Sequence, residues 1–221
     1  MTATRRVAPI VVASMGRSGS TVLSDAICDA NWRRAFAAVR HTRYRRSMLR
    51  QAWRLNAVKL QAGYIYKTHD LPPGNGGKSG ARFVYTFADP FDVISSLLAL
   101  GRRNGMNWIN RHATHMIGGR LVDLEELLDN DVLCLESHFE SWLAFQAPNV
   151  AGVRYDRLWE QEQVIAEFLG IPLRLPPRLR RGSSPGTLSP GQFRRLEQTY
   201  GALREKIGRI PIFGALQTDR P

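Results

Sequence analysis

The segment VVASMGRSGSTVL, residues 11–23, constrains the fold of this chain more than any other stretch. The apolar run Val7–Ala13 is typical of a buried strand, and a helix is expected to begin near Thr21. Between them, Gly16 and Gly19 permit a tight turn. Successive backbone N–H groups at the start of a helix bind anions, so strand, turn and helix together predict an anion-binding loop. The loop nevertheless lacks the lysine of the ATP-binding pattern G-x-x-x-x-G-K-[ST].

Strands and helices alternate along the rest of the chain. Strands are predicted in AGYIYKTHD, ARFVYTFADP and NVAGVRYDRLW. Helices are predicted in PFDVISSLLALG, where a glycine stops the helix, in most of residues 106–146, in EQEQVIAEFLGI and in PGQFRRLEQTYGALREKIG. This order predicts an α/β, P-loop-like fold with a central, mainly parallel sheet flanked by helices. The length of 221 residues fits a single domain, residues 1–221.

Three polar segments follow predicted strands: Gly16–Thr21, Lys67–His69 and Ala88–Asp92. Ligands of open parallel sheets bind outside the carboxyl ends of the strands, so we expect one site there. Lys67 and His69 are two residues apart on a strand and therefore face the same side. A histidine suits general-base work near neutral pH, and an ammonium group can stabilise developing negative charge.

The turn also supplies polar side chains. Arg17 offers a planar cationic fork that suits phosphate or sulfate. Ser18, Ser20 and Thr21 offer hydroxyl donors. A Ser/Thr cluster before a helix can equally be a simple helix cap, and the strand that precedes the turn favours the anion-binding interpretation.

The chain is strongly basic, with 31 Lys and Arg against 19 Asp and Glu and a formal net charge of +12. Such a surplus of positive charge suits an anionic ligand, a nucleic acid or an acidic membrane, and it does not distinguish among these partners. For the arginine-rich residues 32–55 we expect a solvated basic helix, with an anion-attracting surface as the alternative. Two distant cysteines make neither a disulfide framework nor a zinc site. Because no apolar run reaches about 20 residues, we expect a cytoplasmic protein without a membrane span.

Several motifs resemble those of sulfotransferases that use 3′-phosphoadenosine 5′-phosphosulfate (PAPS). SMGRSGST is similar to the family's 5′-phosphosulfate loop, KTHDLPP to its K-T-H-x-P strand end, and YTFADPFDVISS to its Y-V-x-R-N-P-x-D-x-x-x-S segment. HFESWLAFQAPNVAGVRYDRLWEQEQVIAEFLGI resembles the family's succession H-x-x-x-W, N-V, Y-E-D-L and F-L-G-I. RRGS resembles the core of its R-K-G loop. The motifs follow the family order across nearly the whole chain.

The resemblance implies transfer of a sulfuryl group from PAPS, as co-substrate, to a hydroxyl or amine of an acceptor, with no metal. His69 would accept the acceptor's proton. Arg17 and Lys67 would stabilise charge on the sulfuryl oxygens and on the bridging phosphate oxygen, so Arg17 would also help to bind the donor. The loop residues implied for the 5′-phosphate are Ser18, Gly19, Ser20 and Thr21. Those implied for the 3′-phosphate and the nucleotide are Ser96, Tyr155, Arg180, Arg181 and Gly182.

One departure from the family pattern affects donor binding. The family's arginine and asparagine in R-N-P fall on Ala88 and Asp89. Alanine cannot bind a phosphate, and an inward-pointing aspartate would repel one. Either another cation takes over, from the set Arg102, Arg103, Arg180 and Arg181, or the 3′-phosphate is held weakly. A sulfotransferase fold that has lost donor binding is the alternative.

Two other functions stay open. An ATP-dependent small-molecule kinase shares the strand-turn-helix design, but the chain lacks its lysine and a clear Mg²⁺-binding aspartate. A basic nucleic-acid-binding protein would act through residues 32–55 and lose affinity steeply with salt. We rank both behind the sulfotransferase and expect a small-molecule, glycan or peptide acceptor. Arg111, His112 and His115 could line an acceptor pocket, although we expect ordinary structural roles for His41, His112, His115 and His138.

Overall fold

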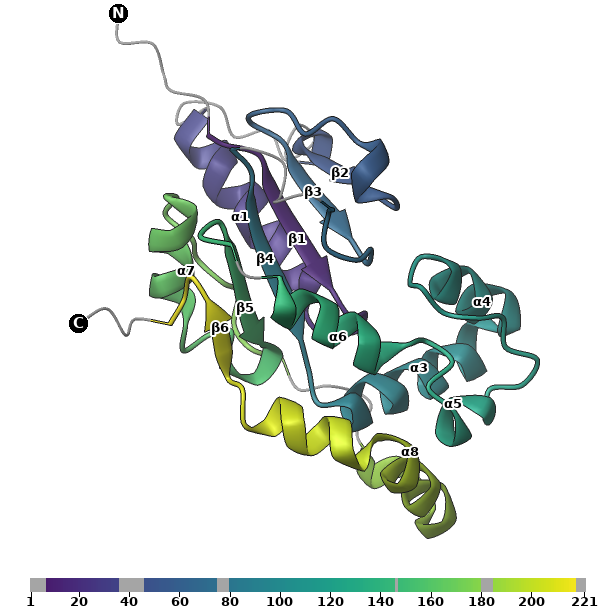
Figure 1. The fold of residues 1–221 in the computed structure, drawn as a ribbon. Coiled ribbons are helices and arrows are strands. Elements are labelled where there is room, and N and C mark those ends of the chain that lie inside the picture. The colour runs from purple at the N-terminus through teal and green to yellow at the C-terminus, as the bar shows by residue number, and fades with distance from the viewer. Residues whose placement is uncertain (1–6, 36–45, 75–79, 146, 180–184, 218–221) are drawn as a thin grey trace, which may run out of the picture.

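The computed structural model describes residues 7–35, 46–74, 80–145, 147–179 and 185–217. Within these ranges six strands form one sheet in the order β2-β3-β1-β4-β5-β6 (Figure 1). The strands are β1 (Ile10–Ser14), β2 (Leu49–Gln51), β3 (Ile65–Thr68), β4 (Arg82–Phe87), β5 (Val150–Arg154) and β6 (Ile212–Gly214). The first five run parallel, and β6 pairs antiparallel with β5. The mainly parallel sheet expected from the sequence is confirmed.

Helices cover both faces of this sheet. They are α1 (Ser20–Ala35), α3 (Pro90–Asn104), α4 (Met106–Thr114), α5 (Glu126–Asp129), α6 (Leu135–Ala144), α7 (Glu162–Leu169) and α8 (Pro190–Gly208). Side chains of β1 alternate between two buried clusters: Ile10 and Val12 pack with α1 and α7, whereas Val11 and Ala13 pack with α3, α6 and α8. In Figure 1, α3, α4, α5 and α8 gather beyond the carboxyl ends of the parallel strands.

Two predictions about helices are wrong. Of residues 32–55, α1 takes the first four, and the described part from 46 onward contains β2 between short 3-10 turns at Arg46–Met48 and Leu55–Ala57. Backbone pairing of β2 with β3 outweighs the helix-favouring composition there. Gly101 does not stop α3, which continues to Asn104 with Gly105 as its C-cap. Leu124 packs where a side chain of residue 101 would lie, so the glycine at this position serves packing. Across the described ranges, no helix combines the length and apolar character that crossing a membrane requires.

Candidate functional site

The glycine turn between β1 and α1 bends sharply. Gly16 and Gly19 have φ of 77° and 87°, and Arg17 between them has φ of 48°, in the left-handed region that favours glycine. The hydroxyl of Ser18 is buried and donates to the carbonyl oxygen of Thr86 on β4 at 2.7 Å. That hydroxyl therefore holds the turn on the sheet, whereas we expected it to face a ligand.

The ring of Tyr155 packs closely against Gly19. A Cβ at residue 19 would lie 2.2 Å from Cδ2 of Tyr155, whereas Gly63, with the same φ of 87°, has no atom within 4 Å of such a Cβ. We expect Gly63→Ala to lower the free energy of unfolding by about 1–2 kcal/mol through backbone strain alone. Gly19→Ala should lower it by about 2–4 kcal/mol, because overpacking against the ring adds to the strain. Urea unfolding of both variants measures the difference, and equal losses would contradict the close packing.

A cavity of about 370 Å³ opens beside the turn, at the carboxyl end of β3. It is lined by Arg17, Gly19, Ser20, Thr21, Val22, Lys67, His69, Ser96, His112 and Tyr155. The structure thus brings together, apart from Ser18, the described residues that the family resemblance implies for catalysis and donor binding. Arg180, Arg181 and Gly182 lie outside the described residues, and the chemical role of each residue stays a prediction.

His69 is buried at the end of β3. Its Nδ1 lies 2.8 Å from Oγ and 3.1 Å from the carbonyl oxygen of Ser14. When Nδ1–H donates to that carbonyl, Nε2 carries the lone pair that a general base needs. Burial, and next the neighbouring His112, lower the pKa of His69 to about 3, so the ring is neutral at pH 7.

His138 supports the backbone that carries His69. Its Nε2 lies 2.9 Å from the carbonyl oxygen of His69, and its Nδ1 lies 3.1 Å from the hydroxyl of Tyr85. Burial lowers the pKa of His138 to about 4, so the neutral ring can donate from Nε2 and accept at Nδ1. The structural role expected for this histidine agrees with these contacts.

Two cationic side chains, Arg17 and Lys67, line the cavity. Lys67 Nζ donates to Oγ1 of Thr21 at 2.6 Å, and Arg17 Nε donates to Oγ of Ser96 at 3.0 Å. Burial lowers the pKa of Lys67; Asp25 opposes this shift, and Arg17 adds to it. An anion in the cavity would favour the charged form of Lys67 and offset its repulsion from Arg17. The cavity is therefore suited to a phosphate or sulfate group.

His112, on α4, is a cavity residue for which the sequence analysis favoured a structural role. Its ring stacks on Trp108, with centroids 5.5 Å apart and planes 4° apart, and its centroid lies 5.3 Å from that of His69. Burial, and next Arg17, lower its pKa to about 4. His115 instead stacks on Trp53 and lies outside the cavity lining. The sequence signal for His112 was only its place among polar residues on a predicted helix.

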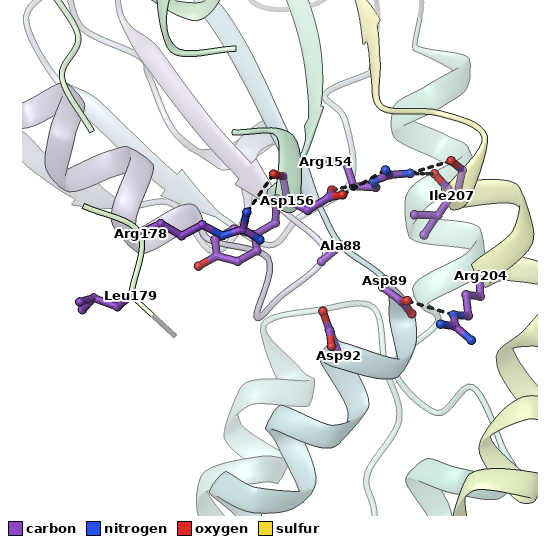
Figure 2. A pocket seen from close by; sticks show the side chains of 11 residues that line it. Ala88, Asp89, Asp92, Arg154, Asp156, Arg178, Leu179, Arg204 and Ile207 are labelled. Atoms are coloured by element: carbon purple, nitrogen blue, oxygen red, sulfur yellow. Dashed lines mark hydrogen bonds and ion pairs between the residues drawn. The ribbon is translucent and has the colours of Figure 1, made fainter. Parts of the chain in front are cut away.

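Figure 2 shows a second cavity, of about 690 Å³. Tyr155 lines both cavities, so the two adjoin. Ala88 and Asp89 line it where β4 leads into α3. Asp89 Oδ1 accepts from the backbone N–H of Phe91 at 2.9 Å, and its Oδ2 accepts from Nε of Arg204 at 3.0 Å. A helix N-terminus and a guanidinium therefore counter the carboxylate that we expected to repel a phosphate.

Two further arginines line the second cavity. Arg154 binds Asp156 and donates to the carbonyl oxygens of Ile207 and Gly208, so it ties β5 to the end of α8. Arg178 is exposed and lies over the ring of Trp159 at 5.4 Å. Figure 2 shows Arg178 and Arg204 on opposite sides of Ala88.

Arg102 and Arg103 are the two expected substitute cations that the structure describes, and they line neither cavity. Both side chains are exposed near the end of α3, and Arg102 pairs with Glu125 at 3.7 Å. No sequence motif marks Arg178 or Arg204. In the described part of the chain, no three His, Cys, Asp or Glu side chains are grouped so as to hold a metal ion.

Comparisons with known proteins bear on the fold. The sequence matches no family model and no curated protein. The structure is similar to the crystal structure of a retinol dehydratase in complex with androsterone and the inactive cofactor PAP, with a TM-score of 0.50 and 16% sequence identity. The two share a fold. The match covers 86% of this chain and 63% of the retinol dehydratase chain.

Proposed function

We propose that this protein transfers a sulfuryl group from PAPS to a hydroxyl or amine of a small-molecule, glycan or peptide acceptor. The observation that carries the proposal is the meeting of Arg17, Lys67 and His69 at one cavity beside a glycine turn. The fold shared with a PAP-bound protein supports it, because PAP is what PAPS becomes when its sulfuryl group leaves.

The cavity residues fit such a donor. When bound, PAPS supplies the activated sulfuryl group. The turn from Gly16 to Thr21 would hold the 5′-phosphate through backbone N–H groups, as helix N-termini do. Arg17 and Lys67 would stabilise charge on the oxygens around the sulfur, and His69 Nε2 would take the acceptor's proton. Ser96, which the family resemblance assigns to the 3′-phosphate, accepts from Arg17 and would also orient that guanidinium.

The second cavity would take the 3′-phosphate end of the nucleotide. Tyr155 borders both cavities, so one extended ligand could occupy them together. Arg204 neutralises Asp89, and Arg178 presents a guanidinium on the other side of Ala88. We propose that these two arginines, with Arg180, Arg181 and Gly182, replace the arginine that the family carries at residue 88.

A transfer assay tests the proposal against the kinase alternative. The protein is incubated with radiolabelled PAPS, excess EDTA and a panel of phenols, amines, sugars and sterols, including androsterone, which retinol dehydratase binds. We expect label to reach at least one acceptor at a rate that EDTA leaves unchanged, because no step requires a metal. In a parallel incubation with ATP and Mg²⁺ in place of PAPS and EDTA, phosphoryl transfer to an acceptor, without any sulfuryl transfer from PAPS, would replace the proposal with a kinase.

A further inference from the structure

The inference concerns His112 and rests on the proposed function. We infer that His112 is a further site residue that donates a hydrogen bond from Nε2 to an oxygen of the sulfuryl group held in the first cavity. It would thus act as a neutral third donor beside the cations Arg17 and Lys67.

His112 carries an unpaired polar atom. In the described part of the chain, Nε2 of His112 is the one buried side-chain nitrogen or oxygen that lacks a hydrogen-bond partner. Leaving such a group unpaired disfavours the folded state by about 1–3 kcal/mol, and native structures rarely keep one without a reason. Because His112 lines the cavity, a ligand there can supply the missing partner.

The ring of His112 lies close to the glycine turn. Nε2 of His112 lies only 3.0 Å from where a Cβ of Gly16 would be, so the ring edge reaches the turn itself. Stacking on Trp108 restrains the plane of the ring. His69 and the two cations line the same cavity, and the ring centroids of His69 and His112 are 5.3 Å apart, so a group attacked near His69 lies within reach of His112.

The neutral imidazole of His112 is suited to donating a hydrogen bond to an anionic ligand. A neutral imidazole carries one N–H, and burial and Arg17 keep this ring neutral at pH 7. The charged donors in the cavity, Arg17 and Lys67, are cations that suit an anionic oxygen, so a ligand oxygen is what Nε2 of His112 would meet. Preorganised neutral donors stabilise developing negative charge without adding repulsion to Lys67 and Arg17. His69 differs because Ser14 orients it as a base.

Two substitutions separate the N–H group from the ring. His112→Phe keeps an aromatic ring on Trp108 but removes Nε2, whereas His112→Gln keeps a side-chain N–H of similar reach. Calorimetric titration with PAPS and with PAP, without acceptor, shows which ligand depends on Nε2. We expect His112→Phe to bind PAPS about tenfold or more weakly, with PAP affinity unchanged, and His112→Gln to restore most of the loss. His115→Phe, three residues away and outside the cavity, is the matched control and should change neither affinity.

The outcomes distinguish the inference from the proposed function. A wild-type protein that binds neither nucleotide overturns the proposed function and, with it, this inference. A wild-type protein that binds both, with His112→Phe weakening neither or weakening PAP as much as PAPS, overturns the inference alone. Urea unfolding of His112→Phe should show no loss of stability, because the change removes an unpaired buried polar atom.

Discussion

Replacing His69 with alanine is expected to abolish sulfuryl transfer while leaving PAP affinity within a few fold of wild type. The loss in rate should be about 10²–10⁴-fold, the usual contribution of a positioned general base. In our proposal Nε2 of His69 meets the acceptor, whereas the turn and the second cavity hold the nucleotide. Initial rates with labelled PAPS and calorimetry with PAP measure the two effects separately.

The control for this substitution is His115→Ala. His115 stacks on Trp53 rather than lining the cavity, so its loss should leave transfer unchanged. Near-normal turnover in the His69→Ala enzyme would remove His69 as the base. A large loss of PAP affinity would instead show that His69 mainly shapes the donor site.

Replacing Arg17 with alanine is expected to weaken both binding and transfer. PAP affinity should fall by about 10–100-fold, since a charged hydrogen bond is worth about 1.5–3 kcal/mol. Transfer should fall further, because the guanidinium is also expected to stabilise charge that grows as the bond to sulfur breaks. Calorimetry with PAP and initial rates at saturating PAPS give the two losses.

Arg17→Lys is the matched variant for this prediction. It keeps the charge and a side chain at the left-handed φ of 48°, but loses the planar fork that donates to Ser96. Its PAP affinity should lie between those of wild type and Arg17→Ala. Unchanged PAP affinity in a folded Arg17→Ala protein would contradict the assignment of the turn to the nucleotide.

The parallel core of the sheet and the meeting of Gly16–Thr21 with Lys67–His69 were predictable from sequence. Strand ends of a parallel sheet share one edge, so local patterns were enough to place both segments. The three-residue strands β2 and β6 were not predictable, because strands so short are specified by the partner they pair with. For the same reason the composition of residues 32–55 favoured a helix where the structure has the strand β2.

The cations of the second cavity were not predictable either. Arg204 reaches Asp89 across 115 positions in the chain, a contact that only the packing of α8 near the start of α3 creates. Arg178 is exposed, and no sequence motif marks it as a ligand-binding residue. His112 likewise acquires its unpaired Nε2 only because α4 packs over the glycine turn.

Calorimetric titration of the wild-type protein with PAP, beside AMP and ATP and without metal, tests the central claim most directly. The account predicts that PAP binds at least about tenfold more tightly than AMP, because only PAP carries a 3′-phosphate for the arginines around Ala88. AMP binding as tight as PAP would contradict the role of the second cavity. No binding of PAP at all would contradict the assignment of this site to a sulfuryl donor.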